Sequence, residues 1–272
     1  MACSACAISA GPPIDKQADI AWVAEGEFCD PETVLPLPDQ TLLVSNVCDF
    51  RTTGDGFLSL LGPDGDVLDW RAVTGLDSPL GMAFADKRLY VVDNNAIKVF
   101  DWPTYKLLHT INLKTRVAND VAIAKDGSLY VSDTGAHQVV KISVSGEQSL
   151  VDHPFEFKNA NGIAVFENTL FVGGERLWRI NLSDGTRSVL GPDWLTDIDG
   201  IEFEEDGRMQ ITPVGGALIR YNEHGRSERL SGPGISSANH GYSTELGLAL
   251  IPTGYDNTVI AIRVKPRGTS RP

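Results

Sequence analysis

The chain repeats a short polar pair, placed just ahead of a β-type strand, about every 40 residues. One full copy runs from Asn159 to Gly185, where three short runs of β-branched, aromatic and aliphatic residues alternate with turn residues. Such runs are too short for helices. A repeat of this length built from strands alone is typical of a propeller blade. The copies begin at Glu32, Leu80-Gly81, Asn119-Asp120, Asn161-Gly162, Asp199-Gly200 and Asn239-His240. The sequence therefore predicts an all-β fold, a six-bladed β-propeller.

The two ends of the repeat region complement each other. Residues 20–28 form a strand without a blade of its own, and the sixth copy ends after residues 258–264, one strand short of four. We expect the N-terminal strand to complete the last blade, which removes a free sheet edge. This gives one propeller domain over residues 19–265, with a flexible leader over 1–18 and a flexible tail over 266–272. The leader lacks the charged and apolar regions of an intact secretory signal.

Composition restricts the class of partner. The formal net charge is −13, and nucleic-acid surfaces need clustered Lys and Arg, so a nucleic-acid partner is not expected. No run approaches the length of about 18 apolar residues that a membrane span needs. The sequence does not determine the oligomeric state or the compartment, although periplasmic or secreted is favoured over cytoplasmic.

The residues that open each copy are expected to form a ring around one mouth of the central channel, because the same loop of every blade lies on the same face. Two carboxylates there would repel each other unless one is protonated or a cation lies between them. Glu32, Asn161 and Asp199 supply the hard oxygen ligands that a divalent cation prefers. Calcium is the first candidate, with zinc, manganese and magnesium as alternatives. The other interpretation is that Asn and Asp before Gly are ordinary turn formers.

Blade 1 has the longest loop between its second and third strands, over residues 46–56. Long loops on a ligand-binding face tend to cover or shape a site, so this loop is a candidate lid, unless it is a neutral insertion. Cys29 and Cys48 both fall on that face and are expected to approach closely and to pair in an oxidising compartment. Cys3 and Cys6 lie in the leader, where a zinc site is not expected.

Four segments resemble blades of the gluconolactonase/regucalcin/luciferin-regenerating-enzyme family of six-bladed propellers: PETVLPLPDQTLLVSN, NDVAIAKDGSLYVSDT, NANGIAVFENTLFVGG and DIDGIEFEEDGRMQIT. The resemblance covers residues 30 to 264. It implies that Glu32, Asn161 and Asp199 are metal ligands and that Asn119 touches substrate or metal-bound water. Two positions depart from the family pattern: Leu80 stands where a polar contact would be wanted, and His240 is an addition.

His240 is a candidate general base, because histidine titrates near neutrality and the repeat places this one at the channel mouth. No serine elbow, P-loop or dinucleotide motif is present. Two hypotheses follow. The first is a metal-dependent hydrolase of a lactone or related ester, with Asp199, His240 and Asn119 as catalytic residues acting on a small-molecule substrate. The alternative is a non-catalytic propeller that binds a ligand or a protein and holds a structural cation.

Overall fold

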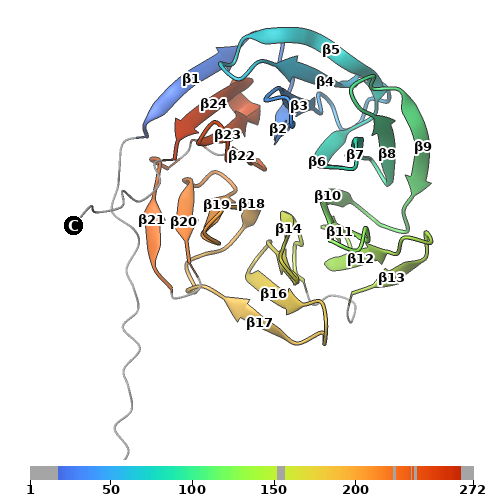
Figure 1. The fold of residues 1–272 in the computed structure, drawn as a ribbon, viewed down its shortest axis with the longest axis vertical. Coiled ribbons are helices and arrows are strands. Elements are labelled where there is room, and N and C mark those ends of the chain that lie inside the picture. Colours follow the sequence, from blue (N-terminus) through green and yellow to red (C-terminus); the bar gives the residue numbers. More distant parts are fainter. Residues whose placement is uncertain (1–17, 152–156, 223–224, 234, 236–237, 265–272) are drawn as a thin grey trace, which may run out of the picture.

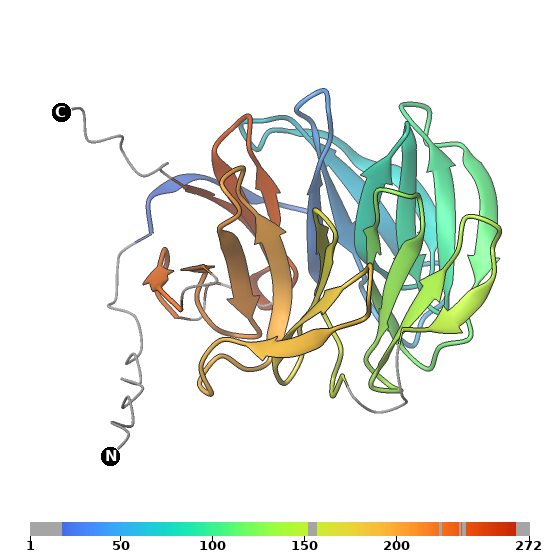
Figure 2. The same cartoon turned by 60° about the horizontal axis from the view of Figure 1, so that its bottom comes forward.

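A computed structural model describes residues 18–151, 157–222, 225–233, 235 and 238–264. Within these residues the chain forms six four-stranded antiparallel sheets arranged around a central axis (Figures 1 and 2). The prediction of a six-bladed β-propeller is therefore confirmed. The predicted tail, residues 1–17 of the predicted leader, and Cys3 and Cys6 lie outside the described residues.

Each of the first three blades is a meander whose innermost strand comes first. Blade 1 contains β2 (Pro31–Pro36), β3 (Leu42–Asn46), β4 (Gly56–Leu61) and β5 (Val67–Leu76). Blade 2 contains β6 (Pro79–Ala85), β7 (Arg88–Asp93), β8 (Ala96–Asp101) and β9 (Leu107–Asn112). Blade 3 contains β10 (Ala118–Ile123), β11 (Leu129–Asp133), β12 (Gln138–Ile142) and β13 (Gln148–Leu150).

Blades 4 and 5 follow the same order, and blade 6 closes the ring. Blade 4 contains β14 (Ile163–Phe166), β15 (Thr169–Val172), β16 (Leu177–Asn181) and β17 (Arg187–Leu190). Blade 5 contains β18 (Ile198–Phe203), β19 (Met209–Pro213), β20 (Ile219–Tyr221) and β21 (Ser227–Arg229). Blade 6 contains β22 (Gly241–Ser243), β23 (Leu248–Thr253), the short 3₁₀-helix η1 (Gly254–Asp256) and β24 (Thr258–Arg263).

The fourth strand of blade 6 is β1 (Ile20–Glu25), which comes from the other end of the chain. It pairs antiparallel with β24, and Val23 lies opposite Ile260 (Figure 1). The predicted closure by the N-terminal strand is confirmed. Because the first and last strands of the ring share one sheet, no blade is left with three strands.

Burial is greatest in the second strands, such as β3 and β23, and least in outer strands such as β9. Leu42, Leu43 and Val44 of β3 are consecutive and all fully buried, because neighbouring blades pack against both faces of this strand. In the outer strand β9, by contrast, no residue is fully buried. Residues on facing sheets form separate apolar clusters between blades, such as Leu89 and Val91 with Leu58 and Val73 between blades 1 and 2. No helix in the described part of the chain is long and apolar enough to cross a membrane.

Candidate metal centre and channel

The innermost strands are irregular at the position of the repeated pair. In blades 1, 2, 3 and 5 the pairing register shifts within the first residues of the strand, at Pro31–Val34, Pro79–Met82, Ala118–Val121 and Ile198–Gly200. A bulge of this kind leaves a residue out of the ladder and re-aims its side chain. In these four blades the repeated pair therefore coincides with the irregular start of the innermost strand.

Hydroxyl groups on the second strand support two of these bulges. The backbone N–H of Thr33 donates to Ser45 Oγ at 3.0 Å, and that of Asp120 donates to Ser132 Oγ at 3.0 Å. Ser45 and Ser132 are completely buried. A backbone N–H released from the ladder is costly to bury without a partner, so a serine at this place stabilises the bulged geometry.

The predicted metal ligands lie at these strand starts and are not satisfied by the protein. Asp199 is buried, whereas Glu32, Asn119 and Asn161 are half-buried. The Oδ1 atoms of Asn119, Asn161 and Asp199 are inaccessible to solvent, and no described group hydrogen-bonds to them. Glu32 Oε2 accepts one hydrogen bond of 2.6 Å from Thr33 Oγ1. Unpaired buried oxygens are rare in folded proteins and indicate a missing partner.

Electrostatics shows that the carboxylates of three blades lie close together. Burial and the nearby Asp199 raise the pKa of Glu32 well above its usual range. Burial and the nearby Asp120 raise the pKa of Asp199 to about 7. Glu32 comes from blade 1, Asp120 from blade 3 and Asp199 from blade 5, so their mutual influence places them around one axis. Neighbouring carboxylates that repel each other in this way are stabilised by a shared cation.

The glycines after Asn161 and Asp199 do not serve as turn residues. Gly162 and Gly200 lie outside the left-handed region that favours glycine. A Cβ on Gly162 would overlap the backbone carbonyl of Asp199, and one on Gly200 would overlap His240 Nδ1 and Thr212 Oγ1. Glycine is needed here because adjacent blades approach closely. The turn interpretation of these two pairs is therefore wrong.

Below the mouth, the innermost strands of blades 1 to 5 and the two residues ahead of β22 in blade 6 line a cavity of about 300 Å³. Aliphatic residues such as Val34, Met82, Ile163 and Ile201 line it, but polar atoms contribute more of its accessible surface than apolar atoms do. Its polar side chains are Thr33, Asp120, Glu202, Asn239 and His240. This cavity is the central channel of the propeller, and it is large enough to admit part of a small molecule.

Asp120 is the functional candidate that the sequence reasoning missed. Its Oδ2 accepts from the N–H of Ile163 in blade 4 at 3.0 Å, and its Oδ1 accepts from the N–H of Val121 at 2.8 Å. Its carboxyl group fills the space beside Gly81 of blade 2 and also hydrogen-bonds to Asn239 ahead of blade 6. Asp120 therefore links four blades beside the ligand ring. The sequence feature that could have identified Asp120 is its position as the second residue of the repeated pair, where three other copies carry glycine.

Burial also shifts the pKa of the two other ionisable channel residues. Burial, helped by Asp120, raises the pKa of Glu202 to about 8. Burial lowers the pKa of His240 to about 3, so the expectation that this histidine titrates near neutrality is wrong. His240 Nδ1 lies 2.9 Å from Thr212 Oγ1, and its buried Nε2 has no partner among the described residues. His240 is a neutral imidazole with one nitrogen facing unfilled space.

The donor set fits a hard divalent cation. In residues 18–264, apart from 152–156, 223–224, 234 and 236–237, no three His, Cys, Asp or Glu side chains gather closely enough to form a metal site on their own. The predicted ligands are the carboxylates of Glu32 and Asp199 and the amide oxygen of Asn161, and Asn119 is predicted to touch substrate or metal-bound water beside them. Oxygen ligands with two negative charges suit calcium or magnesium better than zinc, which prefers nitrogen and sulfur.

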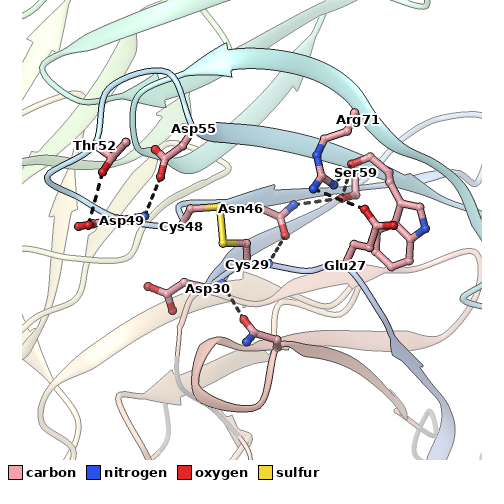
Figure 3. Close-up of a disulfide and its surroundings, with 12 residues drawn as sticks. Glu27, Cys29, Asp30, Asn46, Cys48, Asp49, Thr52, Asp55, Ser59 and Arg71 are labelled. Carbon is pink, nitrogen blue, oxygen red and sulfur yellow. Dashed lines mark hydrogen bonds and ion pairs between the residues drawn. A yellow bond between two sulfur atoms is a disulfide. The ribbon is translucent and has the colours of Figure 1, made fainter.

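A disulfide ties the start of blade 1 to its long loop. Cys29 and Cys48 are bonded, with Cα atoms 4.7 Å apart, which confirms the predicted pairing (Figure 3). The Cys48 N–H also donates to the Cys29 carbonyl at 3.0 Å, and Asn46 Oδ1 accepts from the Cys29 N–H at 3.1 Å. Glu32 lies three residues beyond this anchor. The lid role of the loop between β3 and β4 remains a prediction.

Removing this bond should lower stability measurably. For a sequence separation of 19 residues, the double variant Cys29→Ser/Cys48→Ser should lose about 3 kcal/mol of unfolding free energy, because the denatured chain gains freedom. Urea unfolding with and without a thiol reductant measures this loss. Reductant should bring the unmodified protein to the stability of the double variant and leave the variant unchanged. An unmodified protein that is insensitive to reductant would contradict the prediction.

Comparisons with known proteins find the fold but no relative at the sequence level. No protein-family model matches the chain. No curated protein matches it either. A solved structure provisionally described as a gluconolactonase matches with a TM-score of 0.71 and 16% identity, covering 91% of each chain. A gluconolactonase from Xanthomonas campestris matches with a TM-score of 0.63 and 18% identity, covering 90% of this chain and 87% of that one.

A lyase shares the fold as well. The catalytically inactive His-to-Ala variant of virginiamycin B lyase from Staphylococcus aureus, solved with quinupristin, matches with a TM-score of 0.62 and 11% identity. The match covers 90% of this chain and 99% of that one. Identities this low show a common fold, so the resemblance to the gluconolactonase family is confirmed at the level of the propeller architecture.

Proposed function

We propose that the protein is a metal-dependent hydrolase that opens a lactone or a related ester at the mouth of the propeller channel. One observation supports this most directly. The Oδ1 atoms of Asn119, Asn161 and Asp199 are buried, have no hydrogen-bond partner among the described residues and come from three different blades, and Asp199 lies close enough to Glu32 to raise its pKa. Unsatisfied oxygens that only the ring brings together are the expected form of a cation site in the metal-free protein.

Glu32, Asn161 and Asp199 would hold the cation, and Asn119 would lie beside it. When bound, a divalent cation polarises a carbonyl oxygen and stabilises the negative charge that develops on it. The side-chain amides of Asn119 and Asn161 also carry N–H donors that can orient a substrate oxygen. Calcium is the first cation to test, because all four groups offer oxygen.

Two atoms of the chain are candidates for accepting a proton from the attacking water. Asp199 is the first candidate, because a carboxylate can hold a cation with one oxygen and accept a proton with the other. His240 Nε2 is available in the channel only in the tautomer whose Nδ1–H donates to Thr212 Oγ1. Its lowered pKa makes it a weak base, so we assign the proton transfer to Asp199 and a substrate-orienting role to His240.

One position of the ring favours an apolar substrate over a sugar acid. Leu80 is buried at the place where blade 2 offers its residue to the ring, so that position supplies no polar contact for a sugar hydroxyl or carboxylate. Known gluconolactonases share the propeller fold, which agrees with a small cyclic ester as the substrate class. We therefore rank aliphatic and aromatic lactones above sugar lactones.

The test combines cation binding with turnover. We expect calorimetry on the chelator-treated protein to detect binding of at least one of Ca²⁺, Mg²⁺, Mn²⁺ and Zn²⁺, and the loaded protein to open a lactone from a panel of aliphatic, aromatic and sugar lactones. Asn161→Ala should weaken binding by about 100-fold or more, because even outer partners of a metal ligand are worth 10- to 100-fold. Asn168→Ala, an exposed asparagine at the other end of blade 4, is the matched control and should bind normally.

Three outcomes separate the alternatives. If no cation binds, the proposed enzyme is excluded. If a cation binds and no lactone or ester is opened, the non-catalytic propeller with a structural cation is the correct function. Retained cation binding with reduced turnover in His240→Ala supports the orienting role, and unchanged turnover removes His240 from the reaction. Product mass then distinguishes hydrolysis, which adds water, from the elimination that a lyase performs.

A further inference from the structure

A second hollow lies between blades 4 and 5, on the face opposite the channel mouth. It has a volume of about 410 Å³ and is formed by the turn between β14 and β15, the turn between β18 and β19, and the end of blade 5 near Asn222. Both turns follow innermost strands, which start at the mouth and run away from it. We call this hollow the blade 4–5 cleft. None of the ring residues lines it.

Aromatic rings form the inner wall of the blade 4–5 cleft. Phe166 of blade 4 and Phe203 of blade 5 stack with centroids 4.4 Å apart and planes 13° apart, and Phe171 lies 4.8 Å from Phe203. Phe84, the counterpart of Phe203 in blade 2, instead packs edge-on against Trp102 at 5.5 Å. Phe166 and Phe203 both remain partly exposed toward the cleft. The exposed parts of the two rings offer an apolar surface to another aromatic group.

Arg179 stands at the outer edge of the same cleft. An adjoining cavity of about 380 Å³ shares Thr169 and Arg179 with it and is otherwise lined by Asn181, Thr186, Arg187 and Ser188. The sheet pairing places Arg179 of β16 between Phe171 on β15 and Ser188 on β17. Its Nε donates to Ser188 Oγ at 2.9 Å, which orients the guanidinium. Arg179 therefore borders both hollows.

The charge of Arg179 is not neutralised by the protein. Arg176 pairs with Asp193 at 2.9 Å, and Arg208 pairs with Asp206 at 2.7 Å and with Glu204 at 2.8 Å. Among the described residues, Arg179 forms no ion pair with a carboxylate. Two carboxylates also line the cleft: Glu167 is exposed to solvent at the turn, and Asp206 is paired with Arg208, which lines the cleft as well. Arg179 is therefore the arginine of the cleft whose charge is not used in an ion pair among the described residues.

We propose that the blade 4–5 cleft is a second ligand site, which takes a small aromatic anion. The anionic group would bind the guanidinium of Arg179 and the hydroxyls of Thr169 and Ser188, and the ring would pack against Phe166 and Phe203. Arginine binds carboxylate and phosphate with two parallel hydrogen bonds, and a hollow of this size matches a one-ring ligand. The site is independent of the channel.

The test uses benzoate and phenyl phosphate as anionic rings, benzyl alcohol as a neutral ring and acetate as an anion without a ring. Saturation-transfer NMR and calorimetry are run on the full chain at pH 7.5. We expect one of the anionic rings to bind at millimolar concentration or below, and both benzyl alcohol and acetate to bind much more weakly. The comparison of benzoate with phenyl phosphate tells which anionic group the cleft prefers.

Variants locate the binding. Arg179→Gln should lower the affinity about tenfold or more, since it removes a charge-assisted pair, whereas Arg88→Gln on exposed blade 2 surface should not change it. Asp199→Asn should leave this binding intact, and Arg179→Gln should leave cation binding at the mouth intact. The proposal is overturned if no anionic ring binds at 10 mM, a concentration on the order of ten times a millimolar Kd. It is equally overturned if Arg179→Gln binds normally or if Asp199→Asn abolishes binding.

Discussion

Asp199→Asn is expected to make the metal-free protein more stable at pH 7.5 while abolishing its cation binding. In the folded chain, burial and Asp120 raise the pKa of Asp199 to about 7, against an ordinary value of 3.8. Asparagine has the shape of a protonated aspartate but cannot ionise. The variant therefore escapes the cost of placing a negative charge beside Glu32 and Asp120. It also loses the charge that a cation needs.

The sign of the effect follows from proton linkage. An acid whose pKa is raised by folding binds its proton more tightly in the folded state, so its contribution is most favourable below pH 4 and is lost as pH rises to about 7. Asp120 and Glu202, with pKa values raised to about 7 and about 8, act in the same direction. His240 acts in the opposite direction, because its lowered pKa favours the folded state as pH rises from about 3 toward 6.5. Comparing the variant with the unmodified protein at each pH cancels the contributions of groups that do not interact with Asp199. The remaining difference includes the release of Glu32 and Asp120 from its charge.

Urea unfolding in the presence of a chelator at pH 4 and pH 7.5 measures the difference. At pH 7.5 the variant should exceed the unmodified protein by on the order of a few kcal/mol, since each pKa unit corresponds to about 1.4 kcal/mol. At pH 4 the two should coincide. Adding calcium at pH 7.5 should stabilise only the unmodified protein. A variant that is less stable than the unmodified chain at pH 7.5 without metal would contradict the assignment of Asp199.

Asp126→Asn provides the control with the opposite sign. The N–H and hydroxyl of Ser128 hydrogen-bond to Asp126 and lower the pKa of that exposed carboxyl. Its charge is favourable in the folded state above its ordinary pKa, so the variant should be slightly less stable than the unmodified protein at pH 7.5. The comparison then distinguishes a carboxylate whose proposed role is to bind a cation, Asp199, from a carboxylate that stabilises a turn, Asp126.

The sequence predicts the fold well because a propeller is specified locally and many times over. Each blade repeats the same order of apolar runs and turns. An ambiguous strand assignment in one copy can therefore be resolved by aligning it with the other copies. The closure by β1 was also predictable, since a surplus strand at one end matched a missing strand at the other. The Cys29–Cys48 pair followed from placing both residues on one face of blade 1.

The chemistry of the channel could be predicted only in part. The repeat aligned Glu32, Asn161 and Asp199, and their role as cation ligands stays a prediction. The same reasoning passed over Asp120 in favour of its neighbour Asn119. Whether Asp120 points into the channel depends on a bulge that one-dimensional spacing does not reveal. The acidity of His240 was misjudged for a related reason. Its pKa is determined by burial among neighbouring blades, which no local pattern records.

The blade 4–5 cleft lies further from what a sequence can predict. From the sequence alone, Phe166 and Phe203 would be interpreted as ordinary residues at the ends of innermost strands. Arg179 would be interpreted as a solvent-exposed residue of an outer strand. Their meeting depends on how blade 4 and blade 5 pack against each other. Contacts between repeats are long-range, so they become visible only in three dimensions.

Gly162→Ala is expected to damage both the ring and the stability of the protein, because it inserts a methyl group where blades 4 and 5 touch. A Cβ on Gly162 would overlap the carbonyl oxygen and carbon of Asp199, and backbone atoms cannot move aside as a flexible side chain can. The substitution must push the neighbouring Asn161 away from Asp199. Calcium affinity should then fall by more than about tenfold, although every ligand is still present.

The cost in stability should reach about 3 kcal/mol or more, at the upper end of the range for overpacked sites, because the clash is with backbone. Calorimetry with Ca²⁺ and urea unfolding measure the two effects on the same sample. Gly232→Ala is the matched control, since its added methyl meets nothing within 4 Å and its φ lies outside the left-handed region. That variant should bind calcium and unfold like the unmodified protein. If Gly162→Ala did the same, blades 4 and 5 would not need this contact, and the convergence of Asn161 with Asp199 would have to rest on other residues.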